Sequence, residues 1–424
     1  MADILDELQW RGLVAQTTDE SALRTALADG PITAYCGFDP TAPSLHFGNL
    51  VQLVVLRHLQ KAGHRVICLV GGSTGLIGDP RPTSERVLKT KEQTAEWVRR
   101  IQDQVRPFLD TGGENPAVFV DNLEWTAGLS ALDFLRDVGK HFRVNQMLKK
   151  DAIAARLSSD EGISYTEFSY QLLQGLDYLE LYRQYGCTLQ TGGSDQWGNL
   201  VAGSDLVHRA EGASVHLLTT PLLTDSSGEK FGKSAGNAIW LSADMTSPYA
   251  FYQYWLNVED ASVVTLLKVL TERTRGEVEE LVRQVADEPW KRAAQRALAA
   301  DVTTLVHGAT ATAAVQAASE ALFGTGDLRG LDGPTLRDAT AELPGGTVAT
   351  GMSVVDALVA VGLVDSRNAA RRTIGEGGAS VNGSKVADVE AVIEEADVLA
   401  GGVVVLRRGR RNLAAGRVHD APTP

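Results

Sequence analysis

Two polar side chains and a glycine that could together bind an anion lie at the start of a predicted helix. The segment TAPSLHFGNL (41–50) places His46, Gly48 and Asn49 just before an apolar repeat at helical spacing. The first turn of a helix carries unpaired backbone N–H groups and the positive end of the helix dipole, and both favour an anion. Gly48 leaves the backbone open to close approach. The spacing therefore predicts an anion site, and the alternative is an ordinary capped helix with a surface histidine.

A second group of charged residues lies in the loop DSSGEKFGKSAGN (225–237), which carries Lys230 and Lys233. The loop departs from the Walker phosphate-binding motif, because Ser227 stands where the first glycine would be. Two ammonium groups on a glycine-rich loop can still neutralise the charge of phosphate groups during phosphoryl transfer. The alternative is a solvated basic turn.

Two glycine-rich segments lie at the ends of predicted strands, and each contains an aspartate. GGSDQWGN (192–199) carries Asp195 and Gln196 at the edge of the sheet where ligands bind, although Asp195 could equally cap the following helix. GGSTGLIGDP (71–80) ends in Asp79-Pro80, lacks the GxGxxG dinucleotide fingerprint, and taken alone is typical of a turn. The first segment therefore indicates a ligand site, because an aspartate at this edge of the sheet can accept hydrogen bonds from both hydroxyls of a ribose.

The helical segment YQLLQGLDY places three hydrogen-bonding side chains, Tyr170, Gln174 and Asp177, on one face. Such a polar stripe among leucines is costly to bury without a partner. The stripe favours a polar ligand modestly, and a solvent-facing stripe is the alternative.

The elements that must position these residues alternate between strand-like and helical patterns. Strand-like runs lie at 32–38, 65–72, 117–121, 187–193 and 215–224, and helical runs lie at 49–62, 91–109 and 130–186. This alternation predicts an α/β fold with a parallel sheet and crossover helices. A helical tract follows at 247–322, and a Gly- and Pro-rich tract at 324–351 is predicted to be a linker.

The last seventy or so residues form a distinct small unit that combines helical and strand patterns. Its arginines cluster at helical spacing and beyond the final strand: Arg367, Arg371, Arg372, Arg407, Arg408, Arg410 and Arg411. Such clusters can pair with backbone phosphates of a nucleic acid, and a solvated face is the alternative.

Composition narrows the class of protein. The 424 residues, 44% of them hydrophobic, suffice for two or three domains, and the net charge of −13 argues against a wholly basic nucleic-acid binder. Cys36, Cys68 and Cys187 form no CxxC pair, and the eight histidines show no metal-ligand spacing. The N-terminus lacks a signal-peptide pattern, and no apolar run reaches the length of a membrane span. These features predict a cytoplasmic protein with no membrane association and no protein metal site.

Taken in order, the segments YCGFDPTAPSLHFGN, GDP, YQLLQGLD, GGSDQWGN and KFGKS resemble the class I aminoacyl-tRNA synthetases, and among them the bacterial tyrosyl-tRNA synthetase family. Residues 46–49 stand where the family has its HIGH signature, and residues 230–234 where it has KMSKS. The resemblance covers nearly the whole chain, because residues 352–412 look like the S4 RNA-binding module that ends bacterial members.

The resemblance implies a fold and a division into domains. It implies a Rossmann-like catalytic domain at 1–225 with inserted helices that pair a homodimer, then the KFGKS loop with a helical, anticodon-binding domain at 226–323. The linker at 324–351 would lead to a small α+β S4-like domain at 352–424.

The resemblance also implies that L-tyrosine is activated with ATP and Mg²⁺ and then transferred to tRNA(Tyr). Charge on the polyphosphate would be neutralised by Thr41, His46, Asn49, Arg86, Lys230 and Lys233. ATP and the adenylate would contact Gly37, Asp39, His46, Gly48, Asn49, Gly193, Asp195, Gln196 and Lys233. Tyrosine would contact Tyr35, Asp79, Tyr170, Gln174 and Asp177, and the tRNA would contact Arg367, Arg371, Arg372 and Arg407.

The sequence departs from the family pattern at two places. Asn49 replaces the second signature histidine, and its amide can still donate a hydrogen bond to a ribose oxygen. The loop after Asp79 lacks a lysine that many relatives carry, and Arg81 or Arg86 is the expected replacement.

Three alternative functions stay open at this point. A tryptophanyl sister enzyme shares the architecture, but it usually lacks the S4-like tail and would not call for Tyr35 with Asp177. A free-standing RNA-binding protein with a degenerate synthetase domain would keep the tail but would not need His46 and Asp195. A different nucleotidyltransferase would not need the RNA-binding appendage.

Overall fold

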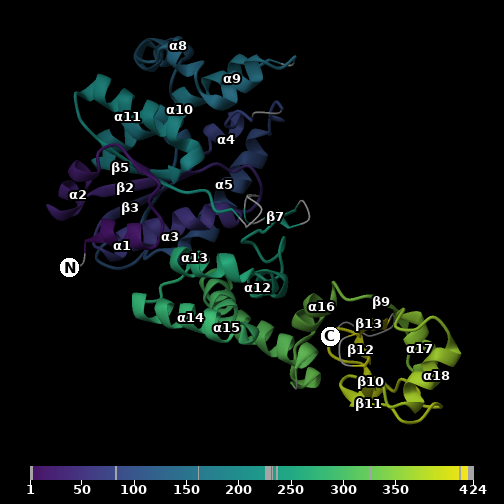
Figure 1. The fold of residues 1–424 in the computed structure, drawn as a ribbon. Coiled ribbons are helices and arrows are strands. Elements are labelled where there is room, and N and C mark those ends of the chain that lie inside the picture. The colour runs from purple at the N-terminus through teal and green to yellow at the C-terminus, as the bar shows by residue number, and fades with distance from the viewer. Residues whose placement is uncertain are drawn as a thin grey trace. The chain divides into compact units, whose positions relative to one another are not determined.

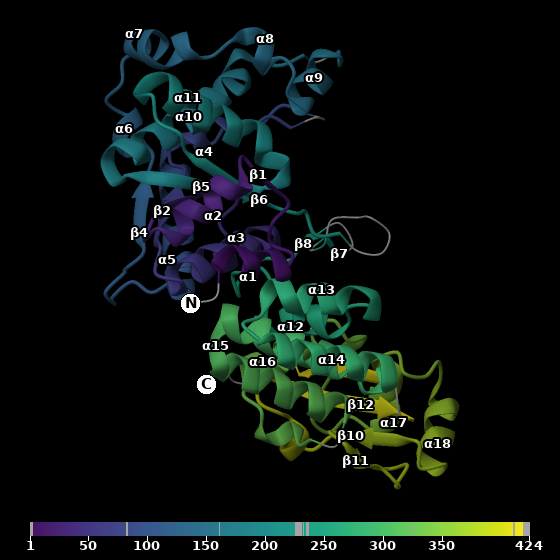
Figure 2. The same ribbon diagram turned by 60° about the vertical axis from the view of Figure 1, so that its left-hand side comes forward.

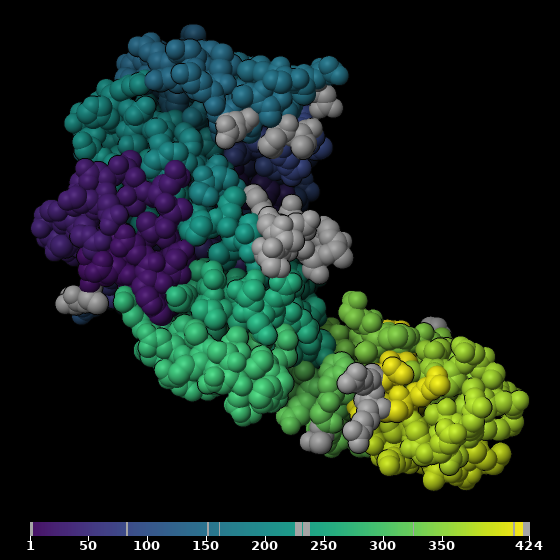
Figure 3. All heavy atoms as spheres, in the orientation of Figure 1, coloured from purple at the N-terminus to yellow at the C-terminus, as the bar shows by residue number. Residues whose placement is uncertain are grey.

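The computed structural model describes residues 3–81, 84–160, 162–224, 231, 233–234, 237–324, 326–409 and 412–418. The chain divides into two compact units (Figure 1 and Figure 3). The first comprises Met1–Met245 and Glu259–Ala294, and the second comprises Thr246–Val258 and Gln295–Pro424. The candidate ligand-binding residues lie in the first unit and the candidate RNA-binding arginines in the second.

The first unit is built on a six-stranded sheet in the order β1-β6-β5-β2-β3-β4. Its strands are β1 (Gln16–Thr17), β2 (Thr33–Phe38), β3 (Arg65–Val70), β4 (Val118–Asp121), β5 (Cys187–Gly193) and β6 (His216–Thr220). All neighbouring strands are parallel except the β1–β6 pair, which is antiparallel. The five parallel strands coincide with the five predicted runs, so the predicted α/β fold is confirmed. The two-residue β1 has no counterpart among the predictions.

Helices pack on both faces of this sheet, as Figure 1 and Figure 2 show with α3 below the strands and α10 and α11 above them. The longer helices are α1 (Ile4–Trp10), α2 (Glu20–Ala28), α3 (Phe47–Lys61), α5 (Lys91–Val105), α10 (Tyr165–Tyr185), α11 (Trp197–Glu211), α13 (Asp260–Leu270) and α14 (Arg275–Asp287). The shorter ones are α4 (Thr74–Ile77), α6 (Leu123–Thr126), α7 (Ala131–Asp133), α8 (Val144–Met147) and α9 (Asp151–Leu157). Leu50, Leu53 and Leu56 of α3 are fully buried, as the helical spacing of these leucines predicts.

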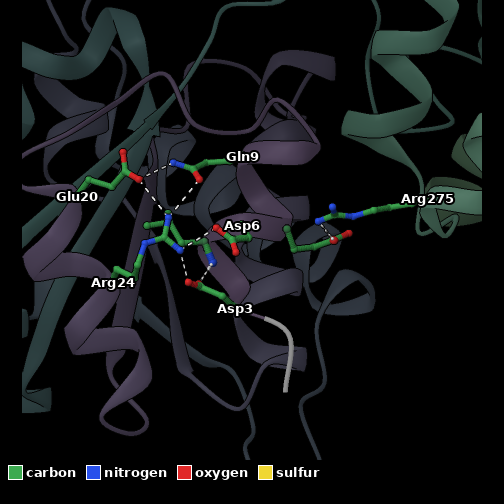
Figure 4. A network of polar contacts seen from close by, with 8 residues as sticks. Asp3, Asp6, Gln9, Glu20, Arg24 and Arg275 are labelled. Carbon is green, nitrogen blue, oxygen red and sulfur yellow. Dashed lines mark hydrogen bonds and ion pairs between the residues drawn. The ribbon is translucent and has the colours of Figure 1, made fainter.

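A polar network joins the two N-terminal helices (Figure 4). The guanidinium group of Arg24 in α2 donates to four side chains: Asp3, Asp6, Gln9 and Glu20. Arg275 of α14 pairs with Glu7 of α1 at 3.2 Å. These side chains are largely exposed, so we expect the network to orient α1 and α2 more than to add stability.

The second unit combines helices with a five-stranded sheet in the order β11-β10-β12-β13-β9. Its helices are α12 (Pro248–Leu256), α15 (Ala293–Phe323), α16 (Gly333–Thr340), α17 (Val354–Ala360) and α18 (Arg367–Gly375), and α15 begins at the boundary with the first unit. Its strands are β9 (Gly345–Val348), β10 (Ala379–Val381), β11 (Ser384–Lys385), β12 (Val403–Arg408) and β13 (Asn412–Val418). The helical tract predicted at 247–322 is present as α12–α15, but α13 and α14 belong to the first unit and α12 and most of α15 to the second.

The tract 324–351 differs from the predicted linker, because it contains α16 and β9. Strand β9 pairs in parallel with β13, and Val348 is fully buried in the core of this unit. The glycines reflect close packing: a Cβ atom at Gly346 would lie 2.2 Å from the carbonyl oxygen of Ala360. A high glycine content therefore marks a crowded strand here, although by composition alone it indicates a flexible segment.

Candidate active site

A cavity of about 480 Å³ opens in the first unit at the carboxyl ends of β2 and β5 and at the start of α3. Its lining includes every predicted ligand-binding residue that the structure describes in full: Tyr35, Gly37, Asp39, Thr41, His46, Gly48, Asn49, Asp79, Arg86, Tyr170, Gln174, Asp177, Gly193, Asp195 and Gln196. Lys230 lies outside the described residues. The backbone of Lys233 pairs with that of Ala238 between the short strands β7 (Lys233–Ser234) and β8 (Asn237–Ala238).

His46 is the N-terminal cap of α3 and also lines the cavity. Its Nδ1 atom accepts a hydrogen bond from the backbone N–H of Gly48 at 3.0 Å, and its own backbone N–H donates to Oδ1 of Asn49 at 3.1 Å. A neutral imidazole that accepts at Nδ1 carries its proton on Nε2, so Nε2 can donate to a ligand. A Cβ atom at Gly48 would lie 2.9 Å from the ring. The glycine is therefore needed for this cap. The capped helix is present, and its first turn lines the cavity, while the anion site stays a prediction.

Asp39 receives two short hydrogen bonds at the cavity wall. The Thr74 hydroxyl donates to one carboxylate oxygen at 2.6 Å, and the Tyr170 hydroxyl donates to the other at 2.7 Å. Burial raises the pKa of Asp39, and the two hydroxyl donors oppose this rise. Because the Tyr170 proton is directed at Asp39, the lone pairs of its oxygen are what the phenol can offer to a ligand cation.

The deep end of the cavity contains Asp177 and Tyr35. Asp177 is 2% exposed and accepts from Nδ2 of Asn122 and Nε1 of Trp125, both at 3.0 Å. Burial raises the pKa of Asp177 well above its usual range. Among the described residues, the hydroxyl of Tyr35 and Oε1 of Gln174 are buried without a hydrogen-bond partner. Buried polar groups are rarely left unpaired, so these two atoms indicate a ligand with matching polar groups.

Asn122 and Trp125 were not predicted from the sequence. Asn122 directly follows β4, at the carboxyl end of a parallel strand, and this position is the signal that could have identified it. Trp125 gives no comparable signal, because its contact depends on how α6 folds back against α10.

Another carboxylate of the cavity, Asp79, lies among polar side chains from α11 and from the residues just before α11 and α9. Gln196 Nε2 donates to one Asp79 oxygen at 3.1 Å, and Lys150 Nζ donates to the other at 2.8 Å. Lys150 was not predicted from the sequence either. Its contact joins residues 71 positions apart in the chain, which no local motif reveals.

Of the two arginines expected to replace the missing lysine, Arg86 lines the cavity. Its Nε donates to the backbone oxygen of Asp79 at 2.9 Å, and its backbone N–H donates to Oε1 of Glu167 at 2.9 Å. Glu167 in turn pairs with Arg156 at 3.0 Å, and both side chains are almost fully buried, at 2% and 1% exposure. A buried ion pair therefore supports the loop that carries Arg86.

Replacing Arg156 by methionine should lower the free energy of unfolding by about 3–5 kcal/mol, because the Glu167 carboxylate would stay buried without a counter-charge. Urea denaturation measures this change. The double variant Arg156→Met/Glu167→Leu should recover most of this stability. Its activity at the cavity should nevertheless be lower than that of the wild type, because the backbone N–H of Arg86 then has no acceptor. Wild-type activity in the double variant would show that the Glu167 carboxylate does not position Arg86.

The candidate RNA-binding arginines of the second unit differ in their surroundings. Arg371 and Arg372 lie exposed on α18, and Arg367 pairs with Asp356 at 2.9 Å. Arg407 instead donates to the backbone oxygen of Leu322 at 2.6 Å, and its Nε is buried without a partner among the described residues. Arg407 is thus engaged within its own unit, unlike the exposed arginines. Arg410 and Arg411 lie outside the described residues.

Comparison with known proteins supports this arrangement over nearly the whole chain. Residues 27–324 match the family model for "tRNA synthetases class I (W and Y)", and residues 335–415 match the "Tyrosine–tRNA ligase SYY-like C-terminal domain". The chain is 62% identical to the tyrosine–tRNA ligase of Streptomyces coelicolor, over 99% of this chain and 100% of that relative.

Two solved structures resemble about three quarters of the chain. The C-terminally truncated mitochondrial tyrosyl-tRNA synthetase of Coccidioides posadasii is 31% identical with a TM-score of 0.66, and it covers 74% of this chain and 91% of its own. The corresponding Aspergillus nidulans structure is 28% identical with a TM-score of 0.69, and it covers 76% of this chain and 95% of its own.

A parallel sheet with a polar cavity at its carboxyl edge and a helix N-terminus in the cavity wall is the arrangement of a nucleotide-binding α/β enzyme. With the family match, it defines a class I tRNA synthetase. The chain belongs to this family, in the branch of the tyrosine–tRNA ligases. In the part of the chain that the structure describes, no helix is long and apolar enough to cross a membrane.

Proposed function

We propose that the chain activates L-tyrosine with the magnesium complex of ATP, releases pyrophosphate, and transfers the tyrosyl group to the 3′-terminal adenosine of tRNA(Tyr) in the cytoplasm. The observation that carries this proposal is that the predicted tyrosine and ATP residues from β2, α3, α10 and β5 line one cavity. The names of the full-length relatives support tyrosine as the amino acid. The test is pyrophosphate exchange into ATP with each amino acid in turn. Exchange that depends on tyrosine supports the proposal, and exchange that depends on another amino acid overturns it.

We assign the two ends of tyrosine from the charges of the side chains that line the cavity. Asp177 and Tyr35 at the deep end would bind the phenol hydroxyl, which can donate to the carboxylate and accept from the neutral hydroxyl. Asp79, with the oxygens of Gln174 and Tyr170, would bind the α-ammonium group. The amino acid carboxylate then lies toward α3, where the phosphates bind. A tryptophan-specific enzyme would have no use for a donor and an acceptor at the deep end, because indole offers only one N–H donor.

The ATP end of the cavity would act by positioning and by charge neutralisation. The tyrosine carboxylate attacks the α-phosphorus in line, and the bond to the leaving pyrophosphate breaks. His46 and Thr41 with the start of α3 would stabilise the negative charge on the phosphates, and Arg86 together with Lys230 and Lys233 would stabilise the leaving group. Gly37, Asp39, Asn49, Gly193 and Asp195 would hold the adenosine. Magnesium enters as part of the ATP substrate.

We also propose that the enzyme is a homodimer that pairs through the helices inserted between β4 and β5. Apolar side chains are exposed along this tract, among them Leu132 at 80%, Val144 at 59% and Tyr165 at 68%. Val144 and Tyr165 line a mainly apolar depression of about 340 Å³, together with Phe142 and Phe168. The tract forms the blue upper surface of the first unit in Figure 3. A large exposed apolar surface of this kind is typical of a protein interface.

The second unit would bind the tRNA backbone through α18. Replacing Arg371 and Arg372 together by alanine should weaken tRNA charging but leave adenylate formation unchanged, because pairing with phosphates adds affinity without entering the chemistry. The plot of log KM for tRNA against log salt should become shallower by about one unit for each arginine–phosphate pair that the substitutions remove.

The matched control for this pair is Arg329→Ala, which removes the same charge from an arginine of the same unit that is bound to Asp397 and the backbone of Ala396. It should leave the salt dependence as it is in the wild type. An unchanged slope in the Arg371/Arg372 variant would show that this face of α18 does not contact the phosphates.

A further inference from the structure

The carboxylate of Asp79 already has a cation beside it that belongs to the protein. Lys150 Nζ lies 2.8 Å from Oδ1 of Asp79 and 2.8 Å from Oδ1 of Asn199. The side chains of Lys150 and Asp79 are 12% and 21% exposed, and Asn199 is fully buried. A half-buried ion pair of this kind is worth more than an exposed one, because it is less screened by water and salt.

The other donors around Asp79 hold the pair in place. Gln196 Nε2 donates to Oδ2 of Asp79 at 3.1 Å, and Asn199 Nδ2 donates to Oδ1 at 3.3 Å. Asn199 Nδ2 also donates to Oε1 of Gln196 at 2.8 Å. Lys150, Gln196 and Asn199 therefore all donate to one carboxylate, and among these three the lysine is the donor that carries a full charge.

The position of Lys150 in the chain indicates that its side chain serves this contact and not the local fold. Lys150 is the N-cap residue of α9, where it makes no side-chain capping bond. Asparagine, aspartate, serine and threonine are preferred at this position, and a cation beside a helix N-terminus is disfavoured by the dipole. A residue that breaks a local preference and makes a specific distant contact is often part of a functional site.

We propose that Lys150 is a specificity-determining residue whose ammonium group competes with the α-ammonium group of tyrosine for Asp79. This inference rests on the proposed function, which assigns the α-ammonium to Asp79. When an amino acid binds, its α-ammonium group takes the place of the Lys150 ammonium group at Asp79, and Lys150 moves away. One charge-assisted hydrogen bond at Asp79 is thus replaced by another of the same kind. A ligand without an amino group leaves the Lys150–Asp79 pair intact, so that Asp79 keeps a counter-charge.

The competition predicts changes of opposite sign for two kinds of ligand when Lys150 is replaced by methionine. Suppose that Lys150 pairs with Asp79 for about nine-tenths of the time. Its removal then lowers the Kd of tyrosine and of tyramine about tenfold, because Asp79 is always open to the ligand's ammonium group. The Kd of 3-(4-hydroxyphenyl)propanoate, which lacks the amino group, should rise several-fold, because its binding now covers a carboxylate that has no cation. A purely structural role of Lys150 would weaken all three ligands together.

Isothermal titration calorimetry on the full chain measures the three dissociation constants. The matched control is Lys149→Met, which removes the same charge from the exposed neighbouring lysine and should leave all three within about twofold. Tighter tyrosine and tyramine binding with weaker propanoate binding in Lys150→Met supports the proposal. Weaker binding of tyrosine and propanoate with unchanged tyramine would overturn it, because Lys150 would then bind the substrate carboxylate.

The variant Asp79→Asn separates a failure of this inference from a failure of the proposed function. If Asp79 binds the α-ammonium, Asp79→Asn weakens tyrosine and tyramine but not the propanoate. If all three ligands respond equally to Asp79→Asn, the assignment of Asp79 is wrong and the competition is overturned with it. If Asp79→Asn shows the amine-selective loss while Lys150→Met shows no change of opposite sign, the assignment of Asp79 stands and the competition alone is overturned.

Discussion

Replacing His46 by alanine is expected to lower kcat for tyrosyl-adenylate formation by about 10²–10³, the usual effect of removing one positioned donor from developing charge. The Nδ1 atom of His46 is fixed by the N–H of Gly48, so the Nε2 proton is directed away from the helix backbone. The Kd of tyrosine should change little, because the substitution leaves the proposed tyrosine contacts, Asp177 and Asp79, in place. Stopped-flow measurement of adenylate formation and equilibrium binding of tyrosine give the two quantities.

The control must separate the imidazole from the helix cap, because His46 serves both. Alanine at the N-cap costs about 1 kcal/mol of stability, whereas serine is among the preferred N-cap residues. His46→Ser should therefore have the unfolding free energy of the wild type but the slow rate of His46→Ala. A wild-type rate in His46→Ser would show that the capped helix, and not the imidazole, carries the effect.

Much of the fold and of the cavity could be predicted because the signals are local. The strand patterns end at the glycine-rich segments, and the carboxyl ends of parallel strands meet at one edge of a sheet. This rule brings Gly37 and Asp39 at the end of β2 close to Gly193 and Asp195 at the end of β5, as the cavity lining shows.

The residues that sequence reasoning missed make contacts that only the folded chain creates. Asn122 and Trp125 reach Asp177 across 55 and 52 positions. No periodicity within their own segment reveals that partner. The same holds for Arg407, whose place in a cluster of arginines does not reveal its hydrogen bond to the backbone carbonyl of Leu322. Composition misleads at 324–351 for a related reason, since glycine suits both a flexible linker and a crowded strand.

Replacing Asp177 by asparagine should reduce the preference for tyrosine over phenylalanine in kcat/KM by about 10- to 150-fold, because a hydrogen bond to a charged group is worth about 1.5–3 kcal/mol. The activity with phenylalanine should fall little, since that substrate makes no such bond. Tyr35→Phe is the matched control, and it should reduce the preference only about 2- to 12-fold, as expected for a neutral hydrogen bond. Pyrophosphate exchange with each amino acid measures the ratio. An unchanged ratio in both variants would show that the phenol is bound elsewhere.

Asp177→Asn should also change the free energy of unfolding, and the pH dependence of this change has a definite sign. Burial raises the pKa of Asp177 above its value in the unfolded chain, which is about 3.9. Its protonated form therefore stabilises the fold, and this contribution is lost as the pH rises through the folded pKa. The free energy of unfolding of Asp177→Asn relative to the wild type should then rise above about pH 4 by up to about 1.4 kcal/mol per pH unit.

Urea denaturation of the two proteins at about pH 4 to 8 tests this slope. Asparagine can accept from only one of Asn122 and Trp125 at full strength, which adds an offset that does not depend on pH. A slope of the expected sign together with a reduced preference for tyrosine would mean that the enzyme keeps a destabilising buried carboxylate because substrate selection requires it. A slope near zero would show that the pKa of Asp177 is not raised in the free enzyme, because the folded and the unfolded chain would then lose this proton at the same pH. A slope that persists up to about pH 8 would show that Asp177 stays protonated in the free enzyme over this range.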